Sequence, residues 1–81
     1  MTVTFYTRRG CHLCEDAKRV LLDVRAKSPF ELAEIDIDTD PELVREYGWD
    51  VPVIEIGEET LMHRIRPEQV LAALRSSLRL Q

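Results

Sequence analysis

The sequence of 81 residues is long enough for one domain with a modest core, and we expect residues 1–81 to form that single domain. A hydrophobic fraction of 44% is too high for a disordered chain. The formal net charge of −4 argues against a nucleic-acid-binding protein, which needs a basic surface, and against electrostatic adhesion to anionic membranes. No apolar run is long enough to span a bilayer, and residues 1–7 lack the pattern of a secretory signal, so we expect a cytoplasmic protein.

The first half of the chain alternates between strand and helix patterns. Residues 2–7 alternate as a strand does, with Val3 and Phe5 on one face. From about residue 11 to residue 27 the period becomes helical. Five apolar residues share one face of this helix: Leu13, Ala17, Val20, Leu21 and Val24. Residues 30–37 alternate again, and because their second face is polar we expect an edge strand.

The second half predicts a short helix, a hairpin and a final helix. Asp40 is the expected N-cap of the short helix and Pro41 its first residue. Residues 51–56 and 60–65 are predicted to be two strands joined by a tight turn. Pro67 opens the last helix. The apolar face of that helix contains Val70, Leu71, Leu74 and Leu78.

The predicted element order is therefore β-α-β-α-β-β-α. A long helix between the first two strands predicts a parallel pair with a right-handed crossover. The tight turn between the last two strands predicts an antiparallel hairpin. We therefore expect an α/β fold, with a mixed four-stranded sheet that carries helices on both faces.

The chemistry that the sequence indicates lies in the segment CHLC, residues 11–14. Cys11 falls where the first strand gives way to the first helix, and a helix N-terminus stabilises a thiolate. Arg8, Arg9 and His12 add positive charge nearby. Cys14 lies one turn further along the same helix face, within reach of the Cys11 sulfur. We therefore expect Cys11 to attack a disulfide and Cys14 to resolve the mixed disulfide that forms.

Other uses of two cysteines at this spacing stay open. They could ligate a metal or simply pack in the core, where free cysteine is common. A structural zinc needs four ligands, and the other soft donors are His12 and His63, which the predicted elements place apart. We therefore expect no metal site within one chain. A metal or iron–sulfur carrier that bridges two chains, and a redox-inert adaptor, are the alternative functions.

A second clue is the dipeptide Val51-Pro52. Proline removes a ladder donor from a strand that should lie inside the sheet, so either a cis peptide in a functional turn or a plain strand start accounts for it. Trp49 comes just before it, and we expect this residue at the rim of the site. Arg64 and Arg66 follow on the predicted fourth strand, where they either grip a carboxylate or form a solvated face. Arg9 is a further candidate for anion binding at the rim.

With CHLC at the first strand–helix junction and DVPV before the third strand, the chain resembles the thioredoxin superfamily, and within it the glutaredoxins. It is most similar to small glutaredoxin-like proteins that share a C-H-L-C type motif, a short helix ending in YG and a VPV segment. The resemblance implies that Cys11 is the nucleophile and Cys14 the resolving cysteine. It also implies that Pro52 is a cis-proline beside the site and that the backbone of Val51 pairs with a bound thiol peptide. Arg8 occupies a place where glutaredoxins often carry lysine.

The chain departs from the glutaredoxin pattern at the residues that surround the motif. His12 and Leu13 stand where glutaredoxins have proline and tyrosine, and Asp50 stands before Val51-Pro52 in place of threonine. Residues 62–69, MHRIRPEQ, replace a Gly-Gly-x-Asp segment that holds a carboxylate of glutathione. The expected function is thus reduction of disulfides in proteins or small thiols by a monomer. We expect no bound cofactor, and glutathione enters only as a candidate co-substrate.

Overall fold

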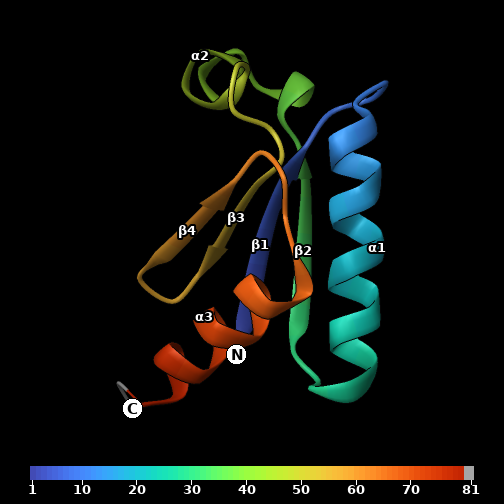
Figure 1. Cartoon of the computed structure of the whole chain (residues 1–81). Helices are drawn as coiled ribbons and strands as arrows, with labels where there is room; N and C mark the ends of the chain where they lie inside the picture. The colour runs from blue at the N-terminus through green and yellow to red at the C-terminus, as the bar shows by residue number, and fades with distance from the viewer. Residues whose placement is uncertain (80–81) are drawn as a thin grey trace.

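The computed structural model describes residues 1–79, with the backbone alone at 78 and 79, so the prediction for Leu78 lies outside the described side chains. The helices are arranged around one sheet (Figure 1). Along the chain the elements are β1 (Thr2–Thr7), α1 (His12–Lys27), β2 (Glu31–Asp36), the short 3₁₀ helix η1 (Ile37–Thr39), α2 (Pro41–Tyr47), β3 (Val53–Ile56), β4 (Glu59–Met62) and α3 (Pro67–Arg79). Among the described residues, no helix is long and apolar enough to cross a membrane.

The four strands form one mixed sheet in the order β2-β1-β3-β4. β1 pairs in parallel with β2 and antiparallel with β3, and β3 and β4 form an antiparallel hairpin. This topology confirms the predicted α/β fold, and the prediction that residues 30–37 supply an edge strand is also confirmed. The predicted caps of α2 are correct, since the Asp40 side chain accepts a hydrogen bond from the Glu42 N–H and Pro41 is the first helical residue.

The core lies between one face of the sheet and the helices α1 and α3. Val3 and Phe5 are fully buried, and the register that pairs them with Ile56 and Ile54 puts all four side chains on this face. The helices complete the core with Cys14, Ala17, Leu21, Val24, Val70, Ala73 and Leu74. Because α1 and α3 both pack on this face, the other face of the sheet is left to the remaining elements of the chain.

The prediction that Leu13 faces the core is wrong, because its side chain is 38% exposed. Its helical position is suitable, since eleven residues of helix bring Leu13 nearly into line with Val24. Figure 1, however, shows the first turn of α1 at the end of the sheet, past the last residues of β1. In that turn the smaller side chain of Cys14 faces the core and is buried.

Three strand ends also differ from the predictions. β3 begins at Val53 rather than at residue 51, since Pro52 has no N–H to give to a ladder. β4 ends at Met62 rather than at residue 65, because His63 has a φ of 66° and cannot continue an extended strand. The His63 N–H instead donates to the Pro52 carbonyl at 3.0 Å. β2 ends at Asp36, whose side chain caps η1.

The second face of the sheet is covered at one end by α2. Tyr6 points to this face because its neighbour Phe5 points to the core. The Tyr6 ring stacks on Tyr47 of α2 with centroids 4.3 Å apart, and its hydroxyl donates to Glu55 Oε1 at 3.0 Å. Helices therefore lie on both faces, as predicted. Burial raises the pKa of Tyr6, and the hydrogen bond to the Glu55 carboxylate raises it further.

The raised pKa of Tyr6 predicts a loss of stability at alkaline pH. In the unfolded chain tyrosine ionises near its ordinary value of 10.0, whereas in the folded protein Tyr6 keeps its proton to higher pH. Above about pH 10 the unfolded state therefore binds fewer protons, and the free energy of unfolding falls as the pH rises. Tyr6→Phe lacks this hydroxyl. We therefore expect its free energy of unfolding, measured by urea between pH 8 and pH 11, to fall less steeply with pH than that of the parent protein. Parallel curves for the two proteins would contradict the prediction.

Candidate active site

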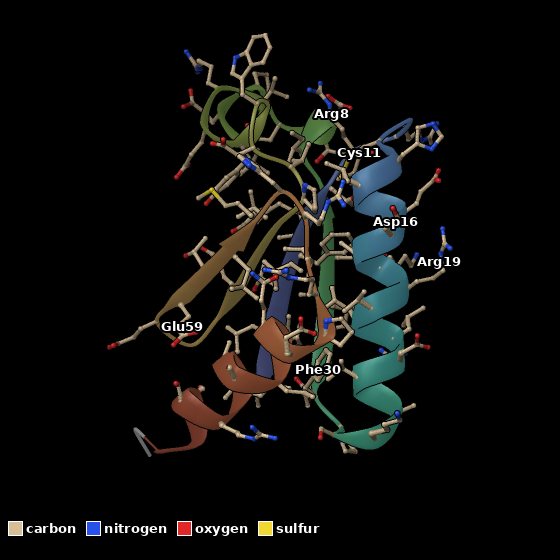
Figure 2. All side chains as sticks on the ribbon, viewed as in Figure 1. Arg8, Cys11, Asp16, Arg19, Phe30 and Glu59 are labelled. Carbon is tan, nitrogen blue, oxygen red and sulfur yellow. A yellow bond between two sulfur atoms is a disulfide. The ribbon has the colours of Figure 1, made fainter. Side chains whose placement is uncertain are left out.

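The two cysteines lie at the junction between β1 and α1. Gly10 has a φ of 73°, a conformation that glycine adopts without steric cost, and it turns the chain toward the helix. Cys11 is the N-cap residue of α1, and its Sγ accepts a hydrogen bond from the Cys14 N–H at 3.2 Å. The two residues are joined in a disulfide with Cα atoms 5.2 Å apart. Figure 2 shows Cys11 at the first turn of α1.

The two sulfurs differ in accessibility. Cys11 is half-buried, whereas Cys14 is 2% exposed and belongs to the core cluster. A disulfide on another molecule can therefore approach Cys11 but not Cys14. This difference follows from helix geometry, because Cys11 caps the helix end and Cys14 lies one turn inward on the core face.

The cis-proline turn lies at the same end of the sheet as the cysteines. The peptide bond between Val51 and Pro52 is cis, as the resemblance implied. Since Val53 pairs with Tyr6, the residues just before β3 lie beside the carboxyl end of β1, from which the chain continues to Cys11. The Val51 N–H already donates to the Tyr47 carbonyl at 3.1 Å. A bound peptide would therefore pair with the carbonyl of Val51 rather than with its N–H.

Arg8 is paired with a carboxylate. Its Nη2 lies 2.6 Å from Asp38 Oδ1 and its Nη1 donates to the Gly48 carbonyl at 3.4 Å. The hydrogen bond to Asp38 raises the pKa of Arg8. Arg8 thereby links the loop before Cys11 to η1 and to the end of α2. The negative charge of Asp38 opposes the positive charge that Arg8 was expected to contribute near the cysteines.

The other two cationic candidates around the motif point outward. The His12 side chain is 95% exposed, and its Nδ1 lies 3.8 Å from Glu15 Oε2. Arg9 is exposed at the mouth of a cleft beside the motif. Their influence on Cys11 acts through solvent and is correspondingly weak.

An open cavity of about 470 Å³ lies on the β2 side of the motif. Its lining residues are Thr7, Arg8, Arg9, Gly10, Cys14, Glu15, Lys18, Glu34 and Asp36. Lys18 of α1 and Glu34 of β2 form an ion pair of 3.0 Å on this wall. Neither residue was predicted from the sequence as part of the site. The register pairs Glu34 with Phe5, so the Glu34 side chain lies on the face of the sheet that α1 covers. The signal that was available is the alternation of residues 30–37, which puts Glu34 and Asp36 on one face of the strand.

The remaining candidates lie in two loops. Trp49 is 96% exposed in the turn after α2. Arg64 and Arg66 lie between β4 and α3, so their prediction as strand residues is wrong. Arg66 Nε is 3.8 Å from Glu68 Oε1. His63 Nε2 lies 3.2 Å from Asp50 Oδ1 and so connects these two loops.

Within the described part of the chain, no three His, Cys, Asp or Glu side chains are grouped so that they could hold a metal ion. The two thiols are used in the disulfide instead. The arrangement supplies one accessible sulfur, one buried sulfur within bonding distance of it, and a turn that can bind backbone next to them.

A C-x-x-C pair at the start of the first helix, within a sheet of order β2-β1-β3-β4, defines a protein with the thioredoxin fold. Thioredoxin 1 of Thermosipho africanus superimposes with a TM-score of 0.76 over 99% of this chain and 97% of its own, at 13% identity, and so shares the fold. The model of the glutaredoxin-like domain family (DUF836) matches residues 2–75. The chain belongs to that family.

Two further proteins are similar in sequence. The glutaredoxin-like protein YDR286C homolog of Dictyostelium discoideum is 33% identical over 88 residues, covering all of this chain and 82% of the relative. The X-ray structure of target protein XcR50 from X. campestris is 31% identical, with a TM-score of 0.78 over 91% of this chain and 96% of the other. The predicted resemblance to the glutaredoxin-like branch is thus confirmed.

Proposed function

We propose that this protein is a thiol–disulfide oxidoreductase that reduces disulfides of proteins or small thiols. One observation carries the proposal: an accessible Cys11 at a helix N-terminus is joined to a buried Cys14 one turn along. A pair that forms a disulfide in the fold without distorting α1 can also exist as a dithiol, and so can store and release two electrons.

The reaction begins with the reduced protein. The Cys11 thiolate attacks one sulfur of a substrate R–S–S–R′, forms the mixed disulfide Cys11–S–S–R and expels R′–S⁻. The Cys14 thiolate then attacks the Cys11 sulfur, closes the Cys11–Cys14 disulfide and expels R–S⁻. Two electrons pass from the cysteines to the substrate, and the two protons of the cysteine thiols end on the two product thiols. A dithiol, or two monothiols such as glutathione, would return the protein to its reduced state.

Two features near Cys11 favour its thiolate during this cycle. The Cys14 N–H that donates to Cys11 Sγ at 3.2 Å would donate more strongly to a charged sulfur. The N-terminus of the 16-residue helix α1 adds the positive end of its dipole. Glu15 in the first turn opposes them, but its side chain is turned to solvent, where its charge is screened.

The substrate would bind over the half-exposed Cys11 with its backbone against Val51. Since the Val51 N–H donates to the Tyr47 carbonyl, the substrate would make one backbone hydrogen bond here, from its own N–H to the Val51 carbonyl. We further propose that the protein works as a cytoplasmic monomer without a resident cofactor. Arg64 and Arg66 remain candidates for gripping a substrate carboxylate.

Cys14→Ser tests the assignment of the two cysteines. The variant keeps the attacking sulfur but cannot release the substrate, so the mixed disulfide accumulates and is detected by mass spectrometry under non-reducing conditions. We expect turnover of a peptide disulfide to fall at least about tenfold, or about 1.4 kcal/mol in the barrier. The matched variant Cys11→Ser should form no adduct. An adduct on Cys11→Ser and none on Cys14→Ser would reverse the two roles.

A further inference from the structure

The single tryptophan of the chain, Trp49, is 96% exposed. Among the large hydrophobic side chains that the structure describes as exposed, the next, Met62, reaches only 46%. An indole ring in water forgoes one of the largest apolar areas that a side chain can bury, and tryptophan is enriched among the residues that dominate binding energy at protein interfaces. The ring is therefore a candidate contact for a partner.

The turn that displays Trp49 is tightly closed. The Tyr47 carbonyl accepts hydrogen bonds from the Asp50 N–H at 2.9 Å and the Val51 N–H at 3.1 Å. The Gly48 N–H donates to the Val44 carbonyl at 2.8 Å, and a Cβ on Gly48 would lie 2.5 Å from that same oxygen. Trp49 thus lies at the apex of a turn whose backbone is fixed on both sides, and its exposure is a property of that turn.

The turn lies at the active-site end of the molecule. Trp49 is two residues before Val51, and Arg8 connects the Gly48 carbonyl with the loop that leads to Cys11. Figure 2 shows Arg8 and Cys11 at the same end of the sheet as α2. A peptide that is bound to Cys11 and continues in the direction of α2 would therefore approach the indole.

The segment that carries Trp49 is acidic. Residues 36–50, which we call the acidic lobe, contain one arginine and the carboxylates Asp36, Asp38, Asp40, Glu42, Glu46 and Asp50. Arg8 and Arg45 pair with Asp38 and Glu42, and His63 lies 3.2 Å from Asp50. The lobe nevertheless keeps a clear excess of negative charge, in a chain whose net charge is only −4. Its electrostatic complement is a basic partner.

We propose that the acidic lobe, with Trp49 at its tip, binds an arginine- or lysine-rich segment of a protein partner. The indole face accepts a guanidinium or ammonium group by a cation–π contact, and the carboxylates pair with neighbouring cations. If the oxidoreductase function proposed above holds, this segment flanks the disulfide that Cys11 attacks, and the lobe selects basic protein substrates over small disulfides.

The test uses the oxidised protein and a synthetic arginine-rich peptide without cysteine, so that no thiol exchange takes place. Since Trp49 is the only tryptophan, its fluorescence reports the contact directly. We expect a saturable change in emission, an affinity at least about tenfold higher than for a glutamate-rich peptide of equal length, and weakening by salt. By calorimetry, Trp49→Ala should bind the arginine-rich peptide about three- to tenfold more weakly.

Leu22→Ala is the matched control, because Leu22 is also an exposed apolar side chain but lies on α1 outside the lobe. It should bind the arginine-rich peptide as the parent protein does. The proposal is overturned if the emission of Trp49 does not change when the arginine-rich peptide is added, or if the two peptides bind with the same affinity. It is also overturned if the emission changes with protein concentration alone, which would show that a second copy of the chain binds this face. Because the peptide and the protein exchange no thiols, these outcomes are independent of whether Cys11 reduces disulfides.

Discussion

Cys11→Ser is expected to lose disulfide reductase activity, by at least about 100-fold in turnover, which corresponds to about 2.7 kcal/mol in the barrier. A serine hydroxyl stays protonated at neutral pH and does not attack a disulfide sulfur. Cys14 cannot take over the first step, since it is 2% exposed and faces the core from the first turn of α1. The measurement is steady-state reduction of a peptide disulfide and of a small aromatic disulfide, with a dithiol as the electron source.

The controls for Cys11→Ser separate chemistry from folding. The variant should unfold at the same urea concentration as the reduced parent protein, because Cys11 is half-buried at a helix end and serine is an equally good N-cap. His12→Ala should lose far less activity than Cys11→Ser, since that imidazole is 95% exposed and turned toward Glu15. Retained activity in a well-folded Cys11→Ser protein would mean that another group performs the attack.

Phe5→Ala is expected to cause the largest loss of stability, about 3–5 kcal/mol in the free energy of unfolding. Phe5 is fully buried in the central strand β1, with Ile54 beside it and α1 and α3 packed over it. The free energy of unfolding of a domain of this size is only about 4–12 kcal/mol, so the expected loss is a large fraction of the total. Urea unfolding followed by circular dichroism measures the change.

Two variants keep that prediction testable if Phe5→Ala does not fold. Phe5→Leu leaves a smaller cavity and should lose clearly less than the alanine variant. Leu13→Ala should lose under about 1 kcal/mol, since Leu13 is 38% exposed. A larger loss for Leu13→Ala than for Phe5→Leu would contradict the position of the core described above.

The features that could be predicted from sequence are those that depend on neighbours along the chain. Alternation marked β1 and the polar face of β2, and the capping residues Asp40 and Pro41 marked the start of α2. The C-x-x-C spacing, together with its place at the first strand–helix junction, predicted that both cysteines lie on one helix turn.

The features that could not be predicted depend on contacts between distant segments. Arg8 was expected to act on the cysteines, but it is paired with Asp38, thirty residues away. The wall formed by Lys18 and Glu34 exists only because α1 packs beside β2. Leu13 had the spacing of a core residue, yet it lies where the sheet has ended, and the length of a strand relative to a helix is not encoded in periodicity.

A redox titration of the two thiols shows whether Cys11 and Cys14 work as a dithiol. The purified protein is equilibrated in dithiothreitol buffers of graded potential, and alkylatable thiols are counted by mass spectrometry. We expect Cys11 and Cys14 to close together as one two-electron couple, between about −180 and −270 mV, the range of known oxidoreductases. If no intramolecular disulfide forms at any potential, or if the thiols resist alkylation until a chelator is added, the oxidoreductase account is contradicted and a metal-binding or purely structural use of the pair replaces it.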